Sequence, residues 1–253
     1  SPIKIMSQLK AKSQIIPVSL SFDKKELYLV QDDNDNGNIY VSTFENDKWS
    51  PIKKLNNNIN TKEWESHASI SADGKTLYFS SARKGGQGGL DIYKSTRNEK
   101  GEWGKAENLG ATINTPYDEE TPVILEDGKT LFFSSKGHKG MGGFDIFTAT
   151  LGSDGKWSSP MNVGYSINTV NNDFAYINKV DNQYAYAPLN RTDLRNEYSG
   201  KEDENNSYKL NLNPTIPNQP LFKVNGFVVF KPGSKPAPEK FFLAVVDSVK
   251  KDT

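Results

Sequence analysis

The residues best suited to chemistry are three carboxylates, Glu65, Glu119 and Asp173, which recur at intervals of 54 residues. Each stands just before the first strand expected in its repeat. If those strands line a central channel, the carboxylates could form an acidic ring for a cation or a polar ligand. Alternatively, each accepts backbone N–H bonds where the chain crosses to the next repeat. Because a catalytic site would break the repeat symmetry, we favour the structural role and predict no catalytic residues.

The remaining polar residues suggest no catalytic constellation. His67 and His138 stand at unrelated repeat positions, which makes them a poor metal pair, and no metal site is predicted from them. No arrangement of serine, histidine and aspartate indicates a nucleophile. Trp64 has no counterpart in the other repeats, and we expect it to be an exposed aromatic residue available for binding.

Two glycine-rich segments, at 83–89 and 136–143, recur between the second and third expected strands. They are not phosphate loops, because a strand rather than a helix follows each of them. We expect the glycines to supply positive φ angles in a wide hairpin. Their polar residues Arg83, Gln87, His138 and Lys139 are either solvated or part of a surface for a partner.

The segment 32–38 is compatible with a calcium loop. Asp32, Asn34 and Asn36 match the opening of an EF-hand loop, and they are the calcium ligands that this pattern predicts. The glutamate expected at position 43 is Thr43, and strands rather than helices are expected on both sides. A plain Asn/Asp/Gly hairpin loop is therefore favoured, and no cofactor is predicted, with calcium at this loop as the alternative.

These candidates are positioned by an internal repeat of about 54 residues. The segment 71–81 recurs at 125–135. A less similar copy stands at 21–30, and a degenerate copy stands at 180–187. Each combines a polar turn with a short apolar run, which predicts a hairpin that enters a buried strand. Several short strands in a fixed period of this length are typical of a β-propeller. We predict an all-β chain with four propeller repeats, in a ring with one or more further blades.

The propeller repeats are expected over residues 1–213, which begin in the middle of a repeat. In the first repeat the expected strands are 15–21, 26–30, 38–43 and 49–55. Residues 1–10 resemble the last strand of a repeat, so either a blade is missing upstream or this strand closes the ring; we favour the missing blade. Residues 214–220 form a proline-rich linker. Residues 221–253 are expected to form the first hairpin of an incomplete β-sandwich.

Composition excludes several function classes. Lys+Arg and Asp+Glu are both 31, so the formal net charge is zero and no global field favours nucleic acid or anionic lipid. The absence of cysteine excludes disulfides, thiolate metal sites and a cysteine nucleophile. No apolar stretch reaches about 18 residues, so no transmembrane segment is predicted.

The repeats resemble the WD40-like, TolB-type propeller repeats of outer-membrane-associated OmpA-family proteins of Bacteroidota. The resemblance covers about residues 11–213. It is carried by Ser-x-Asp-Gly-Lys-Thr-Leu-Tyr-Phe-Ser-Ser at 71–81, Gly-Gly-x-Gly-Gly-x-Asp-Ile-Tyr at 85–93, the related segment at 137–147, and Trp-x-x-x-x-Asn-Leu-Gly-x-x-Ile-Asn-Thr at 103–115. The segment 223–228 is similar to the opening strand of the carboxypeptidase-regulatory-like sandwich that follows the propeller in this family.

The resemblance implies a non-enzymatic scaffold in the periplasm, associated with the outer membrane. Its propeller would bind outer-membrane or periplasmic proteins of a larger complex, and some relatives tether secretion (type IX) or gliding machinery to the cell wall. Peptidoglycan binding is implied only through domains outside this sequence. The alternative function is a glycan-binding or glycan-cleaving propeller, which would place Trp64 near an acidic pocket containing Glu65, Glu119 or Asp173.

Overall fold

The structure is a computed structural model that describes residues 5–11, 15–164 and 167–174, and the backbone of three short strands beyond them. Contacts divide the chain into two units, Ser1–Pro214 and Thr215–Thr253. All of the described structure belongs to the first unit. The expected linker at 214–220 and the expected hairpin at 221–253 lie outside the described residues.

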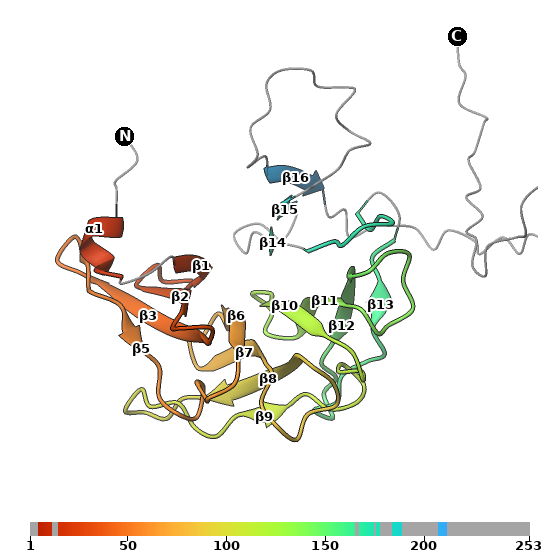
Figure 1. Ribbon diagram of the computed structural model, residues 1–253, viewed down its shortest axis with the longest axis horizontal. Helices are drawn as coiled ribbons and strands as arrows, with labels where there is room; N and C mark the ends of the chain where they lie inside the picture. The colour runs from red at the N-terminus through yellow and green to blue at the C-terminus, as the bar shows by residue number, and fades with distance from the viewer. Residues whose placement is uncertain are drawn as a thin grey trace, which may run out of the picture. The chain divides into compact units, whose positions relative to one another are not determined.

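Three consecutive antiparallel sheets, called blades 1 to 3 here, have strands that follow one another in chain order (Figure 1). Blade 1 contains β1 (Ile15–Leu20), β2 (Glu26–Asp32), β3 (Gly37–Glu45), β4 (Lys48–Trp49) and β5 (Lys53–Lys54). Blade 2 contains β6 (Glu65–Ile70), β7 (Thr76–Ser81), β8 (Asp91–Thr96) and β9 (Glu107–Asn108). Blade 3 contains β10 (Glu119–Ile124), β11 (Thr130–Ser135), β12 (Asp145–Thr150) and β13 (Met161–Asn162).

A fourth sheet follows the same order with β14 (Tyr176–Ile177), β15 (Tyr184–Pro188) and β16 (Ser207–Asn211). The first strands of successive sheets contact one another: β1 contacts β6, β6 contacts β10, and β10 contacts β14. Sheets that follow one another in this way, with their first strands adjacent, are blades arranged about a common centre. The prediction of an all-β propeller fold is confirmed.

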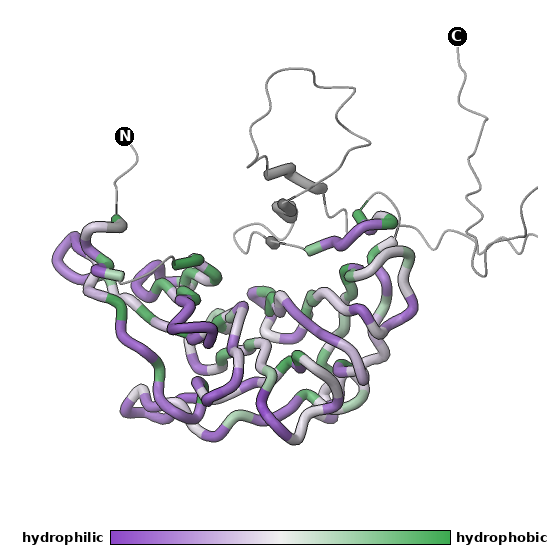
Figure 2. The backbone as a smooth tube through the Cα atoms, viewed as in Figure 1, coloured by the Kyte–Doolittle hydropathy of each residue, from purple (hydrophilic) through white to green (hydrophobic). Residues whose placement is uncertain are grey.

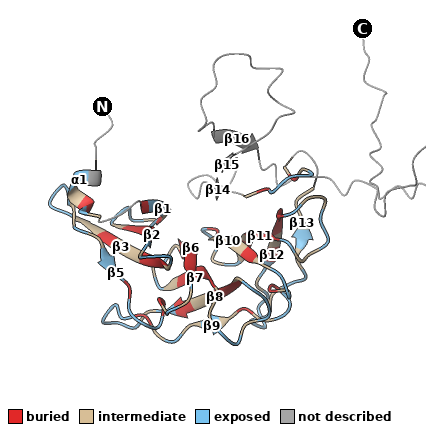
Figure 3. Ribbon diagram, in the orientation of Figure 1, coloured by how far each residue is buried: buried red, intermediate tan, exposed pale blue. Residues whose placement is uncertain are grey.

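The continuous apolar run of each second strand is explained by burial on both faces (Figure 3). In β7, Leu77 and Phe79 belong to the core shared with blade 1, whereas Tyr78 belongs to the core shared with blade 3. Residues of a strand alternate between its two faces, so a blade that lies between two others buries apolar residues on both faces of this strand. Burying one such side chain contributes about 1.5–3 kcal/mol, and this burial holds neighbouring blades together.

Hydrogen bonds close the polar turn that precedes each second strand. Ser71 Oγ donates to Asp73 Oδ1 at 2.6 Å and accepts the N–H of Thr76 at 2.9 Å. Gly74 has φ +68°, which is the left-handed conformation that glycine tolerates best. The Asp-Gly sequence therefore suits this turn, although in blade 1 Lys24 adopts the same left-handed conformation with φ +61°. Figure 2 shows that hydrophilic residues dominate such connections, whereas hydrophobic residues lie along the strands.

Every inner strand of blades 1 to 3 contains an irregularity in its pairing. In blades 2 and 3 the irregular residues are His67 and Thr121, which stand at the same repeat position and have φ +40° and +50°. Serines link the inner strands of adjacent blades: Ser19 Oγ accepts the N–H of Ile70, and Ser69 Oγ accepts that of Ile124. Blades are thus joined by directed hydrogen bonds as well as by apolar packing.

The strand boundaries differ from expectation mainly at the outer edge. The predicted strand at 49–55 is two short pieces, β4 and β5, on either side of Pro51, which has no backbone N–H to donate. Ser50 Oγ instead accepts the N–H of Thr43 at 3.0 Å. Two further tryptophans, Trp103 and Trp157, make isolated bridges at the corresponding places in blades 2 and 3. The repeated tryptophans therefore anchor a broken outer strand against its blade.

Part of the segment 1–10 was expected to be an outer strand, but the described portion contains the short helix α1 (Met6–Leu9). The first residues, 1–4, lie outside the described residues. Leu9 is buried with Leu27 and Leu29 in a core on blade 1, and its carbonyl accepts the N–H of Ile52. Residues 5–9 therefore pack against blade 1, whereas the strand resemblance rests on residues 1–4 and stays a prediction. Among the described residues, no helix has the length and apolar character needed to cross a bilayer.

Candidate functional site

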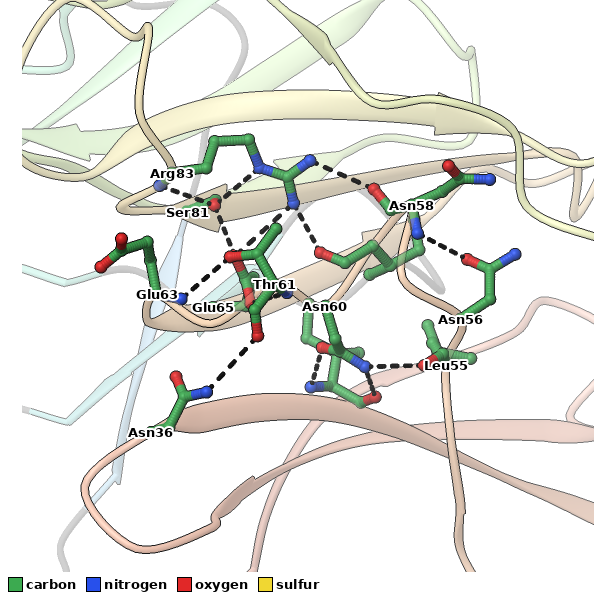
Figure 4. Close-up of polar contacts among 12 residues, drawn as sticks. Asn36, Leu55, Asn56, Asn58, Asn60, Thr61, Glu63, Glu65, Ser81 and Arg83 are labelled. Atoms are coloured by element: carbon green, nitrogen blue, oxygen red, sulfur yellow. Dashed lines mark hydrogen bonds and ion pairs between the residues drawn. The ribbon is translucent and has the colours of Figure 1, made fainter.

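The recurring carboxylates are anchored in the crossovers that carry the chain from one blade to the next. Glu65 is fully buried, and its Oε2 accepts the N–H of Thr61 at 2.7 Å. Its Oε1 accepts the hydroxyls of Thr61 and Ser81, each at 2.7 Å (Figure 4). A guanidinium nitrogen of Arg83 lies 3.6 Å from the same oxygen. Both carboxylate oxygens are therefore engaged within the crossover and the adjoining strand.

We call this set of hydrogen bonds around a buried carboxylate the carboxylate clasp. It recurs in the next two crossovers. Glu119 accepts the N–H and hydroxyl of Thr115, each at 2.7 Å, and the hydroxyl of Ser135 at 2.6 Å. Asp173 accepts the N–H and hydroxyl of Thr169. Burial raises the pKa of Glu119, although these hydrogen bonds oppose the rise. Each carboxylate is thus bound to its own crossover, as the structural alternative expects, and no described contact joins one to another.

An asparagine next to each of these threonines completes the blade. Oδ1 of Asn60 accepts the N–H of Ile39 at 2.7 Å, and its Nδ2 donates to the carbonyl of Ile39 at 2.9 Å. Asn114 and Asn168 make the same pair of bonds with the third strands of blades 2 and 3. The side-chain amide therefore replaces a strand residue as the partner of β3, β8 and β12. Each of these asparagines is the centre of an Ile-Asn-Thr triplet, which recurs at 59–61, 113–115 and 167–169.

Arg83 and His138 have equivalent roles although they stand at different repeat positions. Nη2 of Arg83 donates to the carbonyl of Ile59, and its guanidinium lies 5.0 Å from the ring centre of Phe79. Nε2 of His138 lies 2.7 Å from the carbonyl of Ile113, and its ring contacts an aromatic pair in blade 3. Both side chains thus tie the second strand of their blade to the preceding outer loop. By contrast, Gln87 and Lys139 are exposed.

The glycine-rich loops are packed against the crossovers, and the expected reason for their glycines was wrong. Among the glycines of the two loops only Gly85 has a positive φ. A Cβ on Gly88 would lie 2.0 Å from the carbonyl oxygen of Tyr117, and one on Gly142 would lie 2.0 Å from that of Asn171. A Cβ on Gly86 would lie 2.2 Å from a carboxylate oxygen of Asp91. Close approach of backbone and carboxylate, rather than left-handed conformation, excludes side chains here.

The crossovers and the β2–β3, β7–β8 and β11–β12 loops together form one surface, which we call the crossover face. It comprises residues 33–36, 61–64, 82–90, 115–118, 136–144 and 169–172. Trp64, Tyr117 and Val170 lie in its three crossovers, and they are 39%, 62% and 73% exposed. Trp64 is also held by its neighbour, because a Cβ on Gly37 would lie 2.6 Å from the indole ring.

Sequence analysis predicted that Trp64 is exposed, but it did not single out Tyr117 or Val170. Both stand just before the recurring carboxylates, in crossovers that the repeat already defined. Their backbones are fixed by the glycine-rich loops: the carbonyl of Tyr117 accepts the N–H of Gly89, and that of Asn171 accepts the N–H of Gly143. The signal that could have identified these two residues is their apolar character in a crossover that the carboxylate clasp holds in place.

The loop with the predicted calcium ligands is closed by its own hydrogen bonds. Asp32 Oδ1 accepts the N–H of Asn36 at 3.1 Å, and Asn34 has φ +60°. Asp33, which the calcium pattern did not use, binds Tyr40 at 2.6 Å and Lys54 at 3.3 Å. The described residues contain no group of three or more His, Cys, Asp or Glu side chains placed to hold a metal. These contacts account for the hairpin loop, and calcium binding stays a prediction.

A pocket of about 570 Å³ lies at the opposite end of the blades, beside the turns that begin β2 and end β3. Glu26, Phe44 and Arg97 are among its lining residues. Nη1 of Arg97 lies 2.7 Å from Oε1 of Glu26, so the charges that could fix a ligand already neutralise each other. The pocket lies between blades 1 and 2, and this ion pair links the two blades beside it.

No protein-family description and no curated protein sequence matches this chain. Among solved structures the chain is similar to TolB from Acinetobacter baumannii, with a TM-score of 0.50 and 16% identity over 72% of this chain and 39% of that chain. A putative TolB from Agrobacterium tumefaciens has a TM-score of 0.44 and 16% identity, over 60% and 52% of the two chains. The tricorn protease has a TM-score of 0.46 and 11% identity, over 80% and 22%.

The chain spans 39% and 52% of the two TolB chains that it matches. At 16% identity the likeness to the A. baumannii protein shows the fold alone. The fold is that of a TolB-like β-propeller. Because propellers host both enzymes and binding proteins, the fold by itself assigns no activity.

Proposed function

We propose that this protein is a non-enzymatic scaffold that binds a protein partner through its crossover face. The observation that carries the proposal is the exposure of Trp64, Tyr117 and Val170 on loops whose backbones are held in place. An exposed apolar side chain on a rigid loop loses little conformational entropy on binding. Tryptophan and tyrosine are also the residues that most often dominate the energy of protein interfaces.

Charged side chains on the crossover face between blades 2 and 3 provide a polar rim beside these apolar residues. Lys84 and Lys139 are exposed, and Nζ of Lys136 lies 2.8 Å from Asp118. Lysine side chains at the edge of an interface steer association and select partners of complementary charge. The part of the face between blades 2 and 3 therefore suits a partner that presents acidic groups beside an apolar contact.

The repeated carboxylate clasp supports the non-enzymatic part of the proposal. Glu65, Glu119 and Asp173 all bind a threonine four residues earlier, so the same structural task explains all three. An acid/base pair for glycan cleavage would need two carboxylates facing one substrate. The resemblance to OmpA-family repeats supports a periplasmic location beside the outer membrane, and it extends the proposal to a larger complex such as secretion or gliding machinery.

The experiment is site-specific photo-crosslinking in the organism that makes the protein. A crosslinking amino acid replaces Tyr117 on the crossover face, and a control replaces Lys100, which is exposed in the β8–β9 turn at the opposite end. We expect a discrete protein adduct from position 117 only, and substitution of Val170 by aspartate should reduce its yield. The proposal is refuted if position 117 gives no adduct, or if both positions give the same products.

A further inference from the structure

Blades 2 and 3 differ at one place where the repeat predicts that they should be alike. In blade 3, Thr121 Oγ1 bonds Ser134 Oγ at 2.9 Å, and Ser134 Oγ donates to the carbonyl of Asp173 at 3.0 Å. This chain of bonds satisfies the polar groups at the inner end of blade 3. The counterparts of Thr121 and Ser134 in blade 2, one period of 54 residues earlier, are His67 and Ser80.

In blade 2 the corresponding groups have no hydrogen-bond partner. Ser80 Oγ, Ser66 Oγ and His67 Nδ1 are all buried and unpaired. The counterpart of Ser66 in blade 3 is Glu120, so this position also breaks the repeat. Buried polar atoms are nearly always paired, and three unpaired atoms in adjacent positions indicate a bound water or ion.

These groups converge on the gap between the inner strands of blades 2 and 3. Ser80 is on the same face of β7 as Tyr78, which packs in the core shared with blade 3. Ser66 pairs directly with Ser80 across the sheet, so its side chain lies on that face too. Glu120 reaches the gap from blade 3, and its Oε2 lies 3.5 Å from Nδ1 of His67.

The distance between His67 and Glu120 matches two ligands of one metal ion. It is long for a hydrogen bond, whereas ligands about 2.0–2.1 Å from a tetrahedral zinc ion lie about 3.4 Å apart. Imidazole nitrogen and carboxylate oxygen are both ligands of zinc and of similar divalent ions. We propose that His67 Nδ1 and the Glu120 carboxylate bind a divalent cation of the zinc class, with the hydroxyls of Ser66 and Ser80 hydrogen-bonded to its remaining water ligands.

The accessibility of His67 supports this assignment. Its side chain is 39% exposed although Nδ1 itself is buried, which leaves a path for the ion.

The test is a titration of chelator-treated protein with ZnCl₂, followed by isothermal calorimetry, and with CoCl₂, followed by visible absorption. We expect saturable binding of one ion, and an affinity at least about 10-fold weaker in His67→Thr and in Glu120→Gln, because each removes a ligand. His67→Thr recreates the bonding of blade 3 and should unfold at a temperature no lower than that of wild type, which separates loss of the site from loss of the fold. Glu126→Gln, which removes an exposed carboxylate elsewhere on blade 3, is the matched control.

Two outcomes overturn the proposal. One is the absence of saturable binding to the wild-type protein, which would assign the unpaired atoms to bound water. The other is unchanged affinity in His67→Thr, which would place the ion elsewhere. His138→Gln removes the other of the two histidines and should leave the affinity unchanged.

Discussion

Replacement of Asn114 by alanine tests whether the asparagine of each crossover completes its blade. Asn114 is 1% exposed, and its amide pairs with both the N–H and the carbonyl of Ile92, at 2.7 and 3.0 Å. The alanine variant leaves these two backbone groups buried and unpaired. Each unpaired group costs about 1–3 kcal/mol, so we expect the free energy of unfolding to fall by about 3–5 kcal/mol.

The assay is urea unfolding followed by the fluorescence of the four tryptophans. The matched control is Asn58→Ala, because Asn58 also donates to a carbonyl, that of Trp103, but is exposed, so water replaces the lost bond. We expect the control to lose at most about 1 kcal/mol. If Asn114→Ala costs no more than the control, water or a shifted strand satisfies Ile92, and the asparagine does not complete the blade.

Two further predictions concern a loop and a turn. Gly88→Ala should destabilise the protein more than Gly101→Ala does in thermal unfolding. The new Cβ at position 88 would lie 2.0 Å from the carbonyl oxygen of Tyr117, whereas the Cβ at position 101 meets nothing within 4 Å and adds only the backbone strain of its φ of +78°. A larger loss from Gly101→Ala would contradict the close-approach argument. The hydrogen bond from Ser71 lowers the pKa of Asp73 in the folded protein. The ionised carboxylate therefore stabilises the fold at pH values above its unfolded pKa of about 3.9. This stabilisation is lost as the pH falls through the lower pKa of the folded state. In urea unfolding, Asp73→Ala should therefore have a lower free energy of unfolding than wild type at pH 7, and the difference between the two free energies should become smaller below about pH 4. A difference that does not change with pH would refute this argument.

The fold could be predicted from sequence because the signals that define it are local and repeated. The turn at Ser71 and the apolar run of Leu77 and Phe79 need only their own neighbours to predict a hairpin and a buried strand. Because the same weak signals recur at a fixed period, together they predict one architecture. The broken outer strand was missed because no single residue type marks the break. It falls at Pro51 in blade 1, but blade 2 has the same break between Trp103 and β9 with no proline there.

The roles of individual polar residues could not be predicted to the same extent. The partners of Arg83 and His138 are carbonyls 24 and 25 residues earlier in the chain, and no spacing rule connects them. The glycines of the β7–β8 and β11–β12 loops show the same difficulty. Sequence indicates that a side chain is excluded there, but whether by φ or by a close neighbour depends on the tertiary structure.

The repeat also explains why its departures are informative. Where all three carboxylates, or all three asparagines, make the same bonds, a structural task common to every blade is a sufficient explanation. His67 and Glu120 replace residues that the repeat would supply, and their replacement leaves buried atoms unpaired at a cost of about 1–3 kcal/mol each. Buried unpaired atoms also occur in blades 1 and 3, at Gln31, Asn38 and Asp145. At Ser66, His67 and Ser80 three of them lie together beside a carboxylate, and a ligand in the gap between blades 2 and 3 would satisfy them.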